Sequence, residues 1–123
     1  MEPPYRRFVA WQRCHELAIA IYRATERFPS AERYGMAAQA RRAAFSAAAN
    51  IVEGSAKRGS AEFARYLDIS IGSLNELSYI LLLAHELGIL TQEEFARLDD
   101  LRNTAGALTW KLYTSLKRKG RPG

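Results

Sequence analysis

The chain has 123 residues, of which 48% are hydrophobic and 25% charged, and its formal net charge is +5. This length fits one domain that buries its own core, and a single cysteine, Cys14, excludes an internal disulfide and a cysteine-rich zinc site. Apolar runs such as residues 80–84 are far shorter than the roughly 20 residues of a membrane span, and the charged start lacks a secretory signal. We therefore expect a cytoplasmic protein without a membrane partner.

The first helix is predicted over residues 8–28, after a flexible N-terminal arm at 1–7. Apolar and small residues recur there at the three- and four-residue spacing of one helix face: Trp11, Cys14, Ala18, Ile21, Thr25 and Phe28. Pro29 ends this helix, because proline disfavours helical backbone in the residue before it.

The second helix, predicted over residues 36–56, is rich in alanine and apolar on two sides. One side carries small residues, and the other carries Phe45 and Val52. A helix that is apolar on two sides is normally covered on two sides, so Phe45 and Val52 are predicted to lie in an interface with a neighbouring subunit. The alternative is that the alanines are exposed good helix formers.

The third helix begins at Ser60, a favourable N-cap, and ends at Gly88. The fourth begins at Thr91, which forms a predicted capping box with Glu94, and it ends near Gly120. Short connections between long helices make neighbours antiparallel. The sequence therefore predicts an all-α, up-down-up-down four-helix bundle over residues 8–117, followed by a flexible basic tail at 118–123.

A polar strip follows the second helix and faces a carboxylate of the third. Its predicted members are Gln39, Arg42, Ser46, Asn50, Glu53 and Glu76. Antiparallel register places Arg42 near Glu76, and Asn50 and Glu53 near the start of the third helix. Paired carboxylates are also used in acid–base catalysis, but a structural ion pair that fixes the register of the two helices is the favoured interpretation.

The sequence contains no recognisable catalytic or metal-binding motif. His15 and His85 are each followed by glutamate, and neither belongs to the Glu-x-x-His pair of di-iron bundles. Phosphate-binding glycine loops and hydrolase motifs are also missing from the sequence. We therefore expect no catalytic residue, no metal and no cofactor.

The middle of the chain resembles a known signature. The pattern Gln39-x-x-Arg42-Ala43-x-x-Ser46-x-x-x-Asn50-Ile51-x-Glu53-Gly54-Ser55 is similar to that of the four-helix bundle family named after the 23S rRNA intervening-sequence protein. Supporting pieces follow in order, among them Glu62-Phe63-x-Arg65-Tyr66-Leu67 and Gly72-Ser73-Leu74-x-Glu76-Leu77. Two positions depart from the pattern, because Ala48 replaces a common proline and Ile71 a common arginine, which weakens any nucleic-acid argument built on the third helix.

The resemblance implies a cyclic homopentamer without enzymatic activity. Related bundles resemble the accessory subunit of diversity-generating retroelements, which binds a reverse transcriptase and nucleic acid. The implied partners are therefore other copies of the chain, RNA or DNA, and a protein such as a reverse transcriptase.

The predicted topology brings basic residues from three parts of the chain to one end of the bundle. They are Arg6, Arg7, Lys57, Arg58, Lys117, Arg118, Lys119 and Arg121. Clustered lysine and arginine attract phosphate backbones, and Tyr5 and Tyr113 are the only aromatic residues expected nearby, so we predict backbone contacts with little base reading. The alternatives are two solvated basic tails and a protein-interaction module without nucleic-acid binding.

Overall fold

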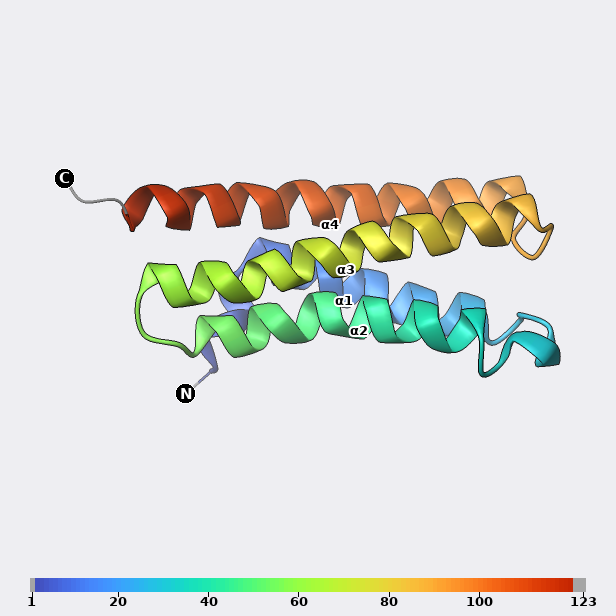
Figure 1. Ribbon diagram of the computed structural model, residues 1–123, viewed down its shortest axis with the longest axis horizontal. Helices are drawn as coiled ribbons and strands as arrows, with labels where there is room; N and C mark the ends of the chain where they lie inside the picture. Colours follow the sequence, from blue (N-terminus) through green and yellow to red (C-terminus); the bar gives the residue numbers. More distant parts are fainter. Residues whose placement is uncertain (1, 121–123) are drawn as a thin grey trace.

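Four α-helices make up most of residues 2–120, the part of the chain that the computed structural model describes (Figure 1). They are α1 (Val9–Thr25), α2 (Met36–Ser55), α3 (Ser60–Glu86) and α4 (Gln92–Lys119). Two short 3-10 helices, η1 (Pro4–Arg7) and η2 (Ser30–Glu32), precede α1 and α2. Each long helix packs against two others, and α1 contacts both α2 and α4, so the predicted up-down-up-down bundle is confirmed.

The core combines large side chains from three helices with small ones from α2. Leu17 and Ile21 of α1, Leu67 and Leu81 of α3, and Leu98 of α4 are almost fully buried. From α2 the core receives mainly alanines and one isoleucine, namely Ala40, Ala43, Ala44, Ala47 and Ile51. Short side chains let α2 approach its neighbours closely, so the alanine-rich sequence is a packing feature of the core.

The helix ends agree only in part with the sequence predictions. The capping box is present, because the Thr91 hydroxyl accepts a hydrogen bond from the Glu94 amide at 3.1 Å and the Thr91 amide donates to Glu94 Oε1 at 2.9 Å. Helix α3 begins at Ser60 as predicted, but its N-cap is Gly59 and no side chain caps it, so the predicted N-cap role of Ser60 was wrong. Gly59 and Gly88 have φ values of 89° and 77°, a backbone conformation that favours glycine at both turns.

The N-terminal segment differs from the predicted flexible arm. Residues 4–7 form η1, which contacts α1 and α2. The Tyr5 ring meets Trp11 edge-on at 4.7 Å, and the Gln12 amide donates to the Arg6 carbonyl at 2.9 Å. These contacts attach the segment to α1, so Arg6 and Arg7 have a defined position.

The C-terminal boundary also moves. Helix α4 continues to Lys119, so Arg118 and Lys119 extend from a helix and not from a free tail. Arg121 and the two residues after it lie outside the described residues.

Helix α3 is long and apolar enough to cross a membrane by length and composition alone. However, 44% of its most apolar window is buried inside the bundle. It contacts both α2 and α4, which is the position of a core helix.

Candidate functional site

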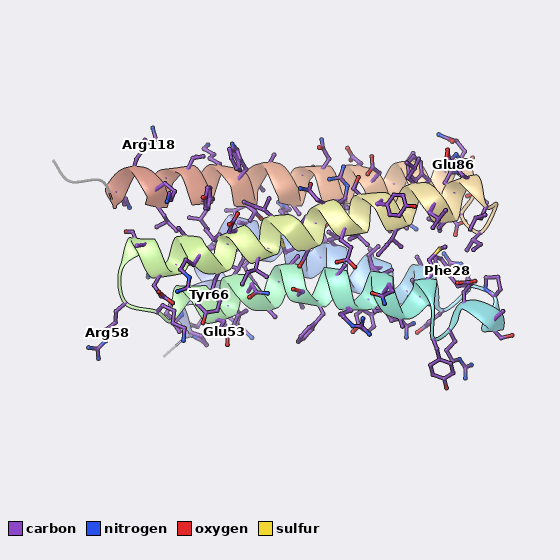
Figure 2. The ribbon with its side chains drawn as sticks, viewed as in Figure 1. Phe28, Glu53, Arg58, Tyr66, Glu86 and Arg118 are labelled. Carbon is purple, nitrogen blue, oxygen red and sulfur yellow. The ribbon has the colours of Figure 1, made fainter. Side chains whose placement is uncertain are left out.

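One end of the bundle gathers the basic residues predicted from topology. At this end α1 begins, α2 turns into α3, and α4 finishes (Figure 1). Figure 2 shows Arg58 on the turn and Arg118 near the end of α4, both at this end of the molecule. The basic end comprises the described residues Arg6, Arg7, Lys57, Arg58, Lys117, Arg118 and Lys119. The structure therefore brings together all of the predicted cations that it describes.

Most cations of the basic end are electrostatically uncompensated. Arg6 pairs with Glu2 at 3.7 Å, but the other six form no ion pair within residues 2–120. Glu62, another nearby carboxylate, pairs with Arg65 at 3.6 Å. The Lys57 ammonium lies over the Tyr66 ring, 5.4 Å from its centroid, while the lysine stays exposed. The exposed heads remain available to an anionic partner.

An apolar groove of about 930 Å³ runs between α1 and α2. Its walls include both predicted interface residues, Phe45 and Val52. The Phe45 side chain is 62% exposed, and Ile19 and Tyr22 of α1 are also exposed along the groove. The complete lining is Trp11, His15, Ala18, Ile19, Tyr22, Arg23, Phe45, Ala48, Ala49, Val52 and Glu53. In a single chain the second apolar side of α2 is thus left uncovered.

The predicted Arg42–Glu76 ion pair is wrong. Both side chains are exposed, and the Arg42 guanidinium instead donates to Gln39 Oε1 at 3.1 Å within α2. Exposed charges keep their hydration, so nothing compels them to pair across the two helices.

Serines connect α2 to α3 where the polar strip was expected to do so. Ser73 donates to the Ser46 hydroxyl at 2.8 Å, and the buried Ser70 donates to the Ala47 carbonyl at 2.8 Å. Asn50 bonds only within its own helix, to the Ser46 carbonyl at 2.8 Å and hydroxyl at 3.0 Å. Glu53 is exposed and makes no side-chain hydrogen bond within residues 2–120, so the predicted bonds of Asn50 and Glu53 to the start of α3 are wrong.

The cysteine and the two histidines, the most reactive side chains of the molecule, are packed against other side chains. Cys14 is fully buried, and burial raises the pKa of its thiol to about 11, although the Thr109 hydroxyl 3.7 Å away acts in the other direction. His15 stacks on Trp11 at 4.9 Å and His85 on Phe95 at 4.7 Å. Across residues 2–120, His, Cys, Asp and Glu side chains nowhere form a group of three that could hold a metal ion.

The chain matches, over residues 6–111, the family described as 23S rRNA-intervening sequence protein. The chain belongs to this family. A solved member of the S23 ribosomal protein family, a protein of unknown function from Bacteroides thetaiotaomicron, is similar in fold, with a TM-score of 0.80 and 22% sequence identity. The match covers 86% of this chain and 96% of that one. A search of curated proteins gave no significant match.

In this member of the intervening-sequence family, the signature on α2 seats that helix against α3. A Cβ atom at Gly54 would lie 2.7 Å from Tyr66 Cβ and 2.9 Å from Phe63 Cδ1. The glycine therefore permits a close approach of the two helices that any other residue would block. Together with the Ser46–Ser73 hydrogen bond, this contact gives Gly54 and Ser46 a packing role between α2 and α3 of this chain.

Sequence reasoning missed two surface features of this family member. The first is a groove of about 560 Å³ between α1 and α4, whose lining includes Arg23, Arg27 and Arg97. The second is Trp110, which is 55% exposed on α4 beside a smaller groove. The i, i+4 spacing of Arg23 and Arg27 was visible in the sequence. The approach of Arg97, and the cavity beside Trp110, depend on which helices become neighbours.

Proposed function

We propose that the protein is a non-enzymatic, self-assembling bundle that binds the phosphate backbone of nucleic acid through its basic end. The observation that carries the proposal is the convergence of six cations from η1, the α2–α3 turn and the last turn of α4, which form no ion pair with other residues between 2 and 120. Lysine and arginine side chains that neutralise phosphates release condensed counterions, which supplies binding free energy without reading the sequence.

The expected affinity depends strongly on salt. The logarithm of the binding constant should fall linearly with the logarithm of salt concentration, with a slope of roughly 0.7 per phosphate contacted on a single strand. The experiment titrates a labelled single-stranded RNA of unrelated sequence with the parent protein and with a basic-end variant. In that variant Lys57, Arg58, Lys117 and Arg118 are changed to Ala.

A matched control separates position from net charge. In the control variant four exposed arginines away from the basic end and outside the groove between α1 and α2, Arg27, Arg33, Arg42 and Arg97, are changed to Ala, which removes the same charge. We expect the basic-end variant to bind more weakly with a smaller salt slope, and the control to keep most of both. Equal affinity of the parent and the basic-end variant would remove the basic end from the mechanism and favour a protein-interaction module.

The self-assembly half of the proposal has a separate support, the groove between α1 and α2. Large exposed apolar patches on a protein surface often mark a site of interaction with another molecule. A second copy of the chain is the proposed occupant, because the groove includes the second apolar side of α2, and the family resemblance implies five copies in a ring. The alternative occupant is a different protein, such as a reverse transcriptase.

A charge placed in the groove tests the assembly. Phe45→Glu should dissociate the oligomer toward the 13.9 kDa chain, because it would bury an unpaired carboxylate in the interface. The control is Tyr79→Glu, since Tyr79 is equally exposed at 63% but lies on α3, outside the groove. Light scattering measures the mass of each. A monomeric parent protein at micromolar concentration would contradict the proposal.

A further inference from the structure

The groove beside Trp110 has the features of a site for a flat ligand. It lies between α3 and α4 and has a volume of about 260 Å³. Its lining combines the Trp110 indole with the side chains of Asn75, Asn103 and Arg102. Ile71 and Leu74 contribute apolar surface, and Leu74 is almost fully buried beneath it. An aromatic face next to amide groups suits a planar ring with polar edges.

The groove is open because α4 carries small residues where a ligand would lie. Gly106 and Ala107 line it, and a Cβ atom placed on Gly106 would meet nothing within 4 Å. Two contacts also restrain the wall. Arg102 is only 16% exposed and pairs with Asp99 at 2.8 Å, and the Tyr113 ring packs on Trp110 at 5.5 Å with an interplanar angle of 28°.

The helical repeat connects this groove to the basic end. Asn103, Trp110 and Lys117 are seven residues apart, which is about two turns, so they follow one face of α4. The rise of about 1.5 Å per residue puts Lys117 roughly 10 Å beyond Trp110 along the helix. A strand whose phosphates are held by the end of α4 therefore passes close to the indole.

We propose that the groove is a base-stacking site, in which an unpaired nucleobase lies on Trp110 and its edge meets the amides of Asn75 and Asn103. The inference rests on the proposed function of the basic end and adds a preference for single strands over duplexes. Stacked, paired bases in a duplex cannot reach the indole. Each amide both donates and accepts hydrogen bonds, so the site accepts different bases. The inference adds one stacked base to the expected backbone contacts with little base reading.

The experiment compares three probes of equal length, about 12 nucleotides, which is within the usual site size of single-strand binders. They are oligothymidylate, an abasic oligomer that has the same phosphates without bases, and a duplex. We expect Trp110→Ala to weaken oligothymidylate binding about 5- to 150-fold, the range for the loss of one stacked base. Binding of the abasic oligomer and of the duplex should stay within twofold of the parent.

Two further measurements make the result specific. Trp110→Phe should recover most of the affinity, because a phenyl ring still stacks, whereas Tyr79→Ala, outside the groove, should change nothing. Oligothymidylate should quench the tryptophan emission of the parent, and the abasic oligomer should not. If this quenching disappears in Trp110→Phe, the base lies on the Trp110 indole.

The outcomes separate this inference from the proposed function. If the parent binds the abasic oligomer and the basic-end variant does not, phosphate binding by the basic end is supported, independently of the result for Trp110. The base-stacking inference is overturned if Trp110→Ala binds oligothymidylate as the parent does, or if this change alters the mass of the assembly, which would make the groove a protein interface. If the parent binds none of the three probes, both proposals fail.

Discussion

At the scale of single residues, the close approach of α2 to α3 depends on the missing side chain of Gly54. Gly54 lies on α2 against Phe63 and Tyr66 of α3, whereas Gly72 lies on α3 where an added Cβ atom would meet nothing within 4 Å. The same substitution at these two glycines should thus have opposite effects on stability.

Gly54→Ala should lower the free energy of unfolding by about 1–3 kcal/mol, because overpacking forces α2 and α3 apart. Gly72→Ala should raise it by roughly 0.4–1 kcal/mol, since alanine restricts the unfolded chain and favours the helix. Urea unfolding of both variants and the parent measures the difference. Equal stability of the two variants would show that α2 and α3 are not held at the described distance.

Cys14 should make stability depend on alkaline pH. Its pKa is raised from 9.0 to about 11 by burial. The thiol therefore ionises first in the unfolded chain, and its contribution to stability is present below about pH 9 and is lost as the pH rises toward 11.

The measurement is the unfolding free energy of the parent minus that of Cys14→Ala. The difference should fall by about 1.4 kcal/mol per pH unit above pH 9, while other groups that titrate there cancel. A thiol reagent should also react slowly with the folded protein at about pH 8 and rapidly once it unfolds. Fast labelling of the folded chain would contradict the burial of Cys14.

At the scale of elements, periodicity predicted the four long helices well, because each helix buries one continuous face. It failed at η1, where Tyr5 is held by Trp11, an aromatic contact that no local pattern encodes. It also failed at the polar strip. Spacing brought Arg42 and Glu76 to the same region, but whether two charges pair depends on burial, and both are exposed. Glu76→Gln should accordingly leave stability unchanged.

The start of α4 should be stabilised by charge. The Thr91 amide, and next the Arg27 guanidinium, hydrogen-bond Glu94 and hold the pKa of its carboxyl below the usual 4.5. The Arg27 Nη2 atom lies 3.0 Å from Glu94 Oε2, so the pair joins the end of α1 to the start of α4.

Glu94→Gln keeps the capping geometry but removes the charge. Because the carboxyl pKa is depressed in the folded state, its contribution is present above pH 4.5 and is lost as the pH falls through the folded pKa. We expect the parent to be more stable at neutral pH by a few tenths of a kcal/mol, as for exposed helix-terminal charges. Acid titration of both proteins by circular dichroism should show that the difference in their stability disappears. A difference in stability that persists in acid would assign the effect to packing.

At the scale of the whole molecule, topology alone predicted which termini and turns meet, so the basic end was foreseeable from the sequence. The groove between α1 and α4 and the groove beside Trp110 were not. Their shapes depend on how two helices pack, as at Trp110 of α4 and Asn75 of α3. The register between two packed helices cannot be read from the sequence of either one.

Salt should separate the two proposed activities. Binding to RNA should weaken steeply between about 50 and 200 mM salt, because counterion release drives it. Assembly through the apolar groove should keep its mass over the same range, since burial of apolar surface is little screened. Light scattering and RNA titration in the same buffers test this. An oligomer that dissociates with salt would point to an ionic interface elsewhere.

The shared location of the first and last described residues has a practical consequence. Glu2 pairs with Arg6 and Gly120 caps the end of α4, and both elements lie at the basic end (Figure 1). A purification tag or fluorescent label added near either residue would therefore lie beside the surface proposed to hold RNA. A polyhistidine tag would add titratable cations there, and an acidic tag would compete for the arginines. The turn between α3 and α4, near Gly88, is at the opposite end. Labels for binding studies therefore belong in that turn, and tagged protein should be compared with cleaved protein.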